Sequence, residues 1–186
     1  MRNFKVVVCA LTLGMTISAQ AANEVTQGTV EFDGKLITET CSIDTDSQTI
    51  KVTLPTLSTQ TLTAAGAVAG SKSIDINVSG CPTGTSAGIT QVAAHFEAIG
   101  GSGVNSSTGN LTNAYTGSET KAGNVEVRLF DADGVTQLTL GETGTAFDID
   151  NSTGKASMRY YGAYYATDTT TAGKVYAKAQ YTLAYP

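Results

Sequence analysis

Hydrophobic and polar residues alternate over short stretches along most of this chain, which is the pattern of a β-strand with one buried face. In residues 91–98, Val92, Ala94 and Phe96 fall on one side of such a strand and His95 on the other. No segment keeps a helical period over three turns, so we expect an all-β fold. The other extended segments predicted before the last one are residues 28–43, 49–54, 73–78, 125–129, 137–140 and 158–167.

The segments between the predicted strands are rich in Gly, Ser, Thr and Asn, as connections usually are. Residues 56–70 are predicted only as a connection, with room for a short helical turn near residues 57–65. Residues 131–134 form the predicted turn of a hairpin. Residues 100–124 form a long loop, which is either a surface excursion or a site of binding variation.

The strongest alternation lies in residues 174–185. A strand of this kind is expected to pair along both edges, but the sequence ends at Pro186 directly after it. A sandwich of the immunoglobulin kind normally has a further strand here to cover its core. We therefore expect the last strand to show one bare edge, or residues 24–34 folded back beside it. The side chains predicted to face the core are Val175, Ala177, Ala179, Tyr181, Leu183 and Tyr185.

The first residues have the features of a secretory signal peptide. Arg2 and Lys5 precede an apolar run at residues 6–17, and small residues follow it. We expect cleavage after Ala21, so that residues 1–21 are the signal. The run is shorter than the about 20 residues that a membrane-spanning helix needs, and no later apolar stretch reaches that length. The mature protein is therefore expected to be exported and soluble.

The arm that follows the signal carries an isolated strand pattern. Gly28, Val30 and Phe32 lie on one side of it, and burial of that side requires an acceptor sheet, which can belong to another molecule. The economical arrangement is exchange: the arm of one subunit fills the open groove of the next, and the contact propagates head to tail. We accordingly divide the mature chain into a donor-strand extension at residues 22–36 and a domain at residues 37–186.

Length and charge narrow the class of protein further. Removal of the signal leaves 186 − 21 = 165 residues, which suits one domain. It also removes two cations and no acid, so the formal charge changes from −5 to −5 − 2 = −7. An acidic surface argues against nucleic acid and anionic membranes as partners.

The cysteines predict one disulfide. Cys9 lies inside the apolar run and is lost with the signal, which leaves Cys41 and Cys81 as an even pair in an oxidising compartment. We expect their bond to join the ends of two core strands. A metal site is the alternative, but two thiols 81 − 41 = 40 positions apart and the single His95 do not supply a ligand set. No metal and no cofactor are expected.

For the residues that could act in catalysis or in binding, the sequence favours structural roles. His95 is predicted on the solvent side of its strand, with no nucleophile signature near it. The chain has no Gly-x-Ser-x-Gly elbow and no paired carboxylates beside an aromatic cleft, so we expect no enzyme. Core and rim packing is favoured over a sugar-binding groove for four tyrosines, which are Tyr160, Tyr161, Tyr164 and Tyr165.

Two acidic segments are similar to calcium-binding loops. Asp131 and Asp133 begin like one, but the sequence Asp-Ala-Asp-Gly at residues 131–134 is typical of a turn. Residues 148–154 begin like another, but Arg159 occupies the twelfth position, where a bidentate carboxylate is needed. We predict turns at both places.

Several of these segments together resemble the major pilin family of chaperone-usher fimbriae, type 1 pilus shaft subunits in particular. They are the arm segment Gly-Thr-Val-Glu-Phe-Asp-Gly at residues 28–34, the spacing of the cysteine pair, the stretch Ala-Tyr-Tyr-Ala-Thr at residues 163–167, and the ending Gln-Tyr-Thr-Leu-Ala-Tyr at residues 180–185. The resemblance covers nearly all of the mature chain. It implies that residues 37–186 are a pilin domain, an incomplete immunoglobulin-like β-sandwich completed by donor-strand exchange.

The resemblance also implies partners and residue roles. Gly28 matches the small donor residue of the family, and Val30 and Phe32 match the donor side chains that fill acceptor pockets. Tyr185 matches the penultimate tyrosine, whereas Pro186 departs from the usual last residue but still supplies the terminal carboxylate that the chaperone reads. The residues implied for the groove and chaperone-contact strand are Tyr181, Leu183, Tyr185 and Pro186.

The implied function is that of a pilus shaft subunit that supports cell adhesion from the bacterial surface. The implied partners are identical or related pilins, a periplasmic chaperone that lends a strand, an outer-membrane usher and a host-surface receptor. A minor, adaptor or adhesive subunit of the same kind of fimbria is the alternative, and a periplasmic β-sandwich enzyme or binding module is a distant one.

Overall fold

We analysed a computed structural model of the chain, which describes residues 29–34, 36, 40–83 and 88–186. The chain divides into two compact units, Met1–Leu36 and Ile37–Pro186, and each is considered by itself below. The expected signal at residues 1–21 and the donor residue Gly28 lie outside the described part. No helix among the described residues is both long and apolar enough to cross a membrane.

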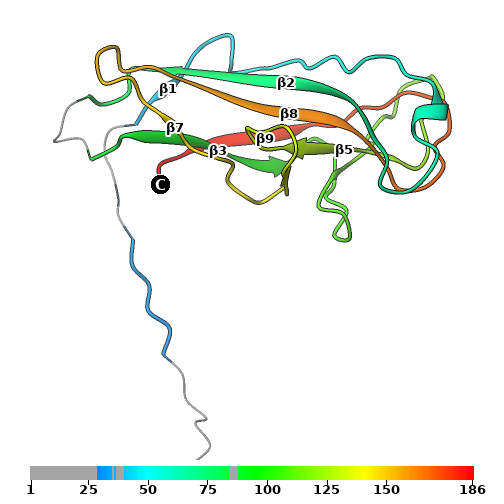
Figure 1. Cartoon of the computed structure of the whole chain (residues 1–186), viewed down its shortest axis with the longest axis horizontal. Coiled ribbons are helices and arrows are strands. Elements are labelled where there is room, and N and C mark those ends of the chain that lie inside the picture. Colours follow the sequence, from blue (N-terminus) through cyan, green and yellow to red (C-terminus); the bar gives the residue numbers. More distant parts are fainter. Residues whose placement is uncertain (1–28, 35, 37–39, 84–87) are drawn as a thin grey trace, which may run out of the picture. The chain divides into compact units, whose positions relative to one another are not determined.

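The regular secondary structure of the second unit is almost entirely antiparallel strand, as the alternating pattern predicts (Figure 1). One sheet has the order β1-β2-β8-β5-β4, with β6 also paired to β5, and the other has the order β7-β3-β9. A short 3₁₀ helix, η1 (Thr59–Thr61), lies in the predicted connection 56–70. The strands are β1 (Ser42–Ile43), β2 (Val68–Ser79), β3 (Gln91–Ala98), β4 (Leu111–Thr112), β5 (Val125–Phe130), β6 (Gln137–Leu138), β7 (Phe147–Asp148), β8 (Ala156–Ala166) and β9 (Ala179–Ala184).

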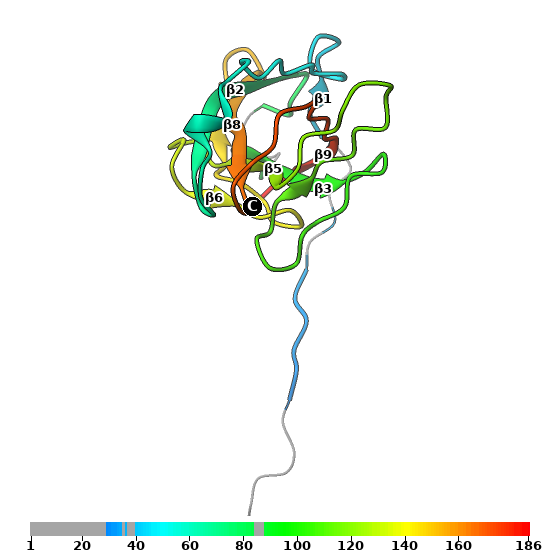
Figure 2. The same cartoon turned by 90° about the vertical axis from the view of Figure 1, so that its right-hand side faces the viewer.

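The core lies between the two sheets. Figures 1 and 2 label β2 and β8 of one sheet and β3 and β9 of the other. Tyr160 of β8 stands at the centre of the core with its side chain fully buried. Its ring makes edge-to-face contacts with Phe96 at 5.3 Å and with Phe147 at 5.7 Å between ring centroids. Its hydroxyl donates to the Thr145 carbonyl at 2.8 Å and accepts from the Ala94 N–H at 3.1 Å. This tyrosine therefore joins both sheets and a connecting segment through one side chain.

Burial of Tyr160 predicts a loss of stability at alkaline pH. Burial raises the pKa of this phenol to about 12, from an ordinary value near 10. Between pH 10 and 12 the folded state keeps the Tyr160 proton, whereas the unfolded state releases it. The contribution of this group to the free energy of unfolding is therefore fully present below pH 10 and is lost as the pH rises toward 12. We expect the free energy of unfolding to drop by roughly 2 to 3 kcal/mol across this interval. Urea unfolding at a series of pH values measures the drop, and the Tyr160→Phe variant should show a smaller one.

Of two strands predicted from the sequence pattern, one is not formed and the other is shorter than predicted. The strand predicted at residues 49–54 is not formed, because residues 50–54 keep alternating burial but belong to no ladder. The last strand begins at Ala179 instead of residue 174. In the preceding residues the backbone is bonded to the long loop: the Tyr176 carbonyl accepts from the Ala114 N–H, and the Tyr176 N–H donates to the side chain of Asn113. The loop thus replaces a strand as the partner of this segment.

The long loop 100–124 also differs from its prediction, because it contains β4. Leu111, predicted as an apolar anchor, is buried and pairs with Val127 of β5. Nothing in the sequence pattern indicated that Glu126 would be buried beside it. The Glu126 carboxylate accepts bonds from the side chains of Asn105, Thr108 and Asn110, so it fastens the loop to β5.

The acidic segments predicted as turns are turns. In the hairpin between β5 and β6, the Asp133 carboxylate accepts from the Thr136 hydroxyl and from the Val135 N–H, and these bonds lower the pKa of Asp133. Hydrogen bonds from the Ser152 hydroxyl, from its N–H and from the Thr153 hydroxyl lower the pKa of Asp150 to about 2. Both carboxylates are thus engaged by their own turns.

Candidate functional site

The last strand, β9, has a strand partner along only one of its edges in the described part of the chain. It pairs antiparallel with β3 from Ala98↔Ala179 to Ala93↔Ala184, and it ends the sheet β7-β3-β9, whose three strands are labelled in Figure 1. By contrast, β3 is occupied on both sides, since β7 and residues 141–144 bond to its other edge. Among the described residues the last strand thus shows one bare edge, the first of the two expected alternatives.

The inner face of β9 is also covered less completely than that of its neighbour. Val92 and Ala94 of β3 are 0% exposed, and Phe96 is 4% exposed. Five of the six residues predicted to face the core from 174–185, all but Val175, pack against the same core, yet all six remain only half-buried. A strand whose apolar side chains alternate inward but stay partly exposed lacks covering structure on one side.

An open hollow of about 570 Å³ lies along this uncovered side. It is bounded by residues 40–43 and Gln48 on one side and by Leu183 and Tyr185 on the other. Tyr181 of β9 and Tyr185, which directly follows β9, reach across to the opposite side. The Tyr185 hydroxyl accepts from the Cys41 N–H at 2.9 Å, and the Tyr181 hydroxyl donates to the Ser47 carbonyl at 2.6 Å. Burial, and secondarily the nearby carboxylate of Asp46, raise the pKa of Tyr181.

The structure thus brings together three of the four residues predicted for the groove strand, while Pro186 is exposed beyond them. We refer below to the hollow and the two segments beside it, residues 40–48 and 179–185, as the groove. The sequence does not predict that Ser47 and Gln48 belong to the groove, because a local pattern does not show which residues lie across from the last strand.

The disulfide anchors one side of the groove. Cys41 and Cys81 are both buried and are bonded at 2.09 Å between sulfur atoms. The pair was predicted to join two strand ends, and this is right for Cys81, which follows β2. It is wrong for Cys41, which precedes β1, because β1 begins only at Ser42. The bond therefore holds the start of β1, next to the groove, against the end of β2.

The described part of the arm belongs to the first unit and forms no ladder there. A ladder requires a partner, and the described residues of the arm have none. Its apolar side chains are strongly exposed: 75% for Val30, 92% for Phe32 and 100% for Leu36. Exposed large hydrophobic residues in one short segment mark a surface for association.

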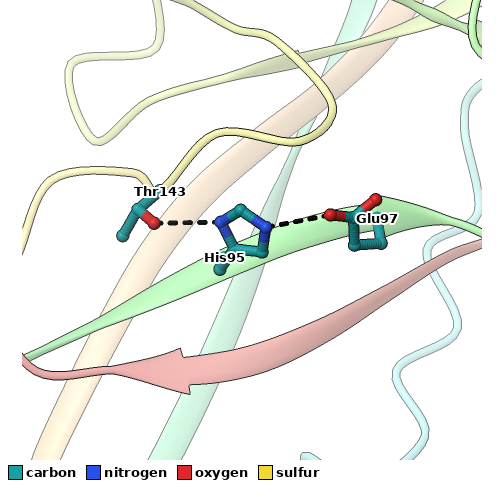
Figure 3. A network of polar contacts seen from close by, with 3 residues as sticks. All are labelled: His95, Glu97 and Thr143. Atoms are coloured by element: carbon teal, nitrogen blue, oxygen red, sulfur yellow. Dashed lines mark hydrogen bonds and ion pairs between the residues drawn. The ribbon is translucent and has the colours of Figure 1, made fainter. Parts of the chain in front are cut away.

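His95 takes part in a polar contact on the outer face of β3, as Figure 3 shows. Its Nδ1 lies 3.0 Å from the Thr143 hydroxyl, and its Nε2 lies 3.0 Å from a carboxylate oxygen of Glu97. The Thr143 residue also forms a β-bridge with His95. This side chain therefore fastens the segment 141–144 to the edge of β3, in keeping with the structural role that the sequence favours.

The four tyrosines of β8 do not form one groove. Tyr160 belongs to the core, and Tyr165 packs under the Arg128 guanidinium at 3.8 Å from the ring centroid. Tyr164 is half-buried, and burial raises its pKa. Packing is thus the observed role of these rings.

Comparison with solved structures gives the class of protein. The crystal structure of the P pilus rod subunit PapA superposes with a TM-score of 0.59 at 20% identity, covering 78% of this chain and 99% of that one. A chaperone-usher pilus structure gives a TM-score of 0.61 at 22% identity, over 86% and 96% of the two chains. The fold is therefore the immunoglobulin-like sandwich of chaperone-usher pilins.

Sequence comparison gives the family. Residues 30–186 match the fimbrial protein family. The chain is 34% identical to the F17 fimbrial protein of Escherichia coli, covering 92% of this chain and 94% of that protein. It is also 34% identical to the major fimbrial subunit SMF-1 of Stenotrophomonas maltophilia, over 92% and 99% of the two chains. The chain belongs to the fimbrial protein family of chaperone-usher pilins, whose members are structural subunits and not enzymes.

Proposed function

We propose that this chain is the shaft subunit of a chaperone-usher fimbria and polymerises by inserting its N-terminal arm into the groove of the next subunit. The observation that carries the proposal is the free edge of β9 with its half-exposed inner face. An extended segment added at this edge would continue the sheet β7-β3-β9 by one strand and cover the core. The exposed side chains of Val30 and Phe32 are apolar and are therefore suited to cover it.

The energy available to such an exchange is considerable. Burial of Val30 and Phe32 contributes about 1.5 to 3 kcal/mol each. Each backbone hydrogen bond of an added strand contributes about 0.5 to 1.5 kcal/mol net. Together these gains offset the ordering of the arm, because an arm of residues 22–36 can form several such bonds. The contact is heterologous, so repetition produces a fibre instead of a closed ring.

The same open edge accounts for the proposed partners. Until a neighbouring subunit supplies an arm, a periplasmic chaperone lends a strand to the groove, and an outer-membrane usher is the site of exchange. The assembled subunits form a fimbrium on the bacterial surface, where they support adhesion to a host receptor. The matches to two proteins described as major fimbrial subunits, from Stenotrophomonas maltophilia and Haemophilus influenzae, favour a shaft role over a minor one.

Deletion of the gene tests this function directly. We expect cells without the chain to lose a class of surface fibres that electron microscopy detects on the parent strain, and plasmid-borne expression to restore them. Mass spectrometry of fibres sheared from the parent should identify this chain as the main component. Fibres of unchanged number in the deletion strain would exclude a shaft role, and presence of the chain only in trace amounts would indicate a minor subunit.

A further inference from the structure

The edge of β1 that faces away from β2 borders the groove. Asp44 donates its N–H to the Asn77 carbonyl of β2 at 3.0 Å. In an antiparallel pair, the backbone groups of successive residues point alternately toward and away from the partner strand. The groups of Ser42 therefore point toward β2, whereas those of Cys41 and Ile43 point away from it. The Cys41 N–H and the Ile43 carbonyl thus lie where an additional strand would bond.

In the lone chain, two side chains form hydrogen bonds with these backbone groups. The Tyr185 hydroxyl accepts from the Cys41 N–H at 2.9 Å, and the Gln48 amide donates to the Ile43 carbonyl over a longer 3.4 Å. Both Tyr185 and Gln48 line the groove. The Cys41 N–H and the Ile43 carbonyl therefore each have a side-chain partner in place of a strand.

We propose that Tyr185 and Gln48 form a releasable cap on the β1 edge, which slows the uptake of a strand until the two side chains are displaced. The proposal rests on the proposed function, because the strand in question is the arm of a second copy. An exposed strand edge pairs readily with other chains, and exported subunits at high concentration need protection against premature pairing. Side-chain bonds provide this protection and exchange for backbone bonds without leaving a buried polar group unpaired.

Tyr181 supplies a contrast on the same strand. Its hydroxyl donates to the carbonyl of Ser47, which is buried and not on the β1 edge. The Ser47 hydroxyl in turn accepts from the Asn77 N–H at 2.9 Å. Tyr181 is thus tied into the packed turn, so loss of its hydroxyl should lower stability without opening the edge.

The rate of strand uptake tests the cap. A fluorescent peptide with the sequence of residues 23–34 is mixed with the mature chain, kept dilute enough to stay monomeric, and association and dissociation are followed by anisotropy. We expect Tyr185→Phe to raise the association rate roughly 2- to 10-fold, the factor that corresponds to one net hydrogen bond, and to leave dissociation unchanged. Gln48→Ala should act in the same direction by a smaller factor. Tyr176→Phe, at an exposed tyrosine that does not line the groove, is the matched control.

The other outcomes of this experiment overturn either the cap alone or strand exchange as well. Association that is unchanged or slower in both Tyr185→Phe and Gln48→Ala overturns the cap while leaving strand exchange intact. Faster dissociation from Tyr185→Phe also overturns it, because the hydroxyl would then contact the inserted strand. If the peptide binds neither the wild-type chain nor any variant, the proposed function itself fails, and the cap with it. Circular dichroism establishes that each variant is folded, and Gln48→Ala carries the test if Tyr185→Phe is not.

Discussion

Phe32→Asp is expected to abolish fibres while leaving the pilin domain folded. The Phe32 side chain is 92% exposed in the arm, so its replacement removes little burial among the described residues of the lone chain. In the proposed exchange it fills an apolar pocket, and the substitution forfeits about 1.5 to 3 kcal/mol of burial. It also places a carboxylate in that pocket, which costs several kcal/mol more without a partner. Because every joint of the fibre needs this contact, the loss is repeated at each subunit.

Electron microscopy of whole cells, with immunoblots of sheared fibres and of periplasm, measures this effect. We expect no fibres and an accumulation of monomeric subunit in the periplasm. Glu31→Gln, one residue away on the opposite side of the arm, is the matched control and should give normal fibres. Gly28→Tyr should reproduce the fibre loss by obstructing passage of the arm. Normal fibres from Phe32→Asp would refute insertion of this face of the arm.

Removal of the disulfide is expected to have the largest effect on the stability of the monomer. Cys41 and Cys81 are separated by 40 positions. Because the bond restricts the unfolded chain, the loop-closure entropy for a loop of this length corresponds to about 4 kcal/mol of stabilisation. This is a large share of the roughly 5 to 15 kcal/mol by which domains are stable. The Cys41→Ala, Cys81→Ala double variant should therefore unfold at a much lower urea concentration.

Loss of the bond should also disturb the groove, because Cys41 donates its N–H to Tyr185 and stands at the start of β1. Urea unfolding with and without dithiothreitol checks the effect. The reduced wild-type chain should be as unstable as the double variant, and the variant should not respond to the reductant. A loss below about 1 kcal/mol, well under the value expected from loop closure, would contradict the assigned role of the bond.

The elements that could be predicted correctly are those whose partners lie close in the chain or whose burial pattern is strong. The strand at residues 91–98 was predicted with the bounds of β3, since its two faces differ clearly in polarity. The hairpin of β5 and β6 followed from the Asp-Ala-Asp-Gly turn at residues 131–134, where Gly134 adopts a positive φ of 67°. Both depend on interactions between neighbouring residues.

The elements that were predicted wrongly depend on distant partners. Residues 50–54 have the alternation of a strand, but no strand lies beside them within the described residues. The start of the last predicted strand bonds instead to residues of the long loop near Asn113. Alternation reports which side of a segment is buried. It does not report whether a backbone partner is present.

For the candidate site, the sequence by itself determined the alternating inner face of the last strand, the cysteine pair and the apolar side of the arm. These are properties of residue type and order, which the two-residue period of extended chain converts directly into faces. Only the tertiary structure decided that residues 40–48 lie across the groove, that Tyr181 and Tyr185 reach them, and that one edge of β9 has no strand partner in the described part of the chain. Those facts depend on which segments meet in space, and the contacts of Tyr185 with Cys41 and of Tyr181 with Ser47, 144 and 134 positions apart, leave no trace in a local pattern.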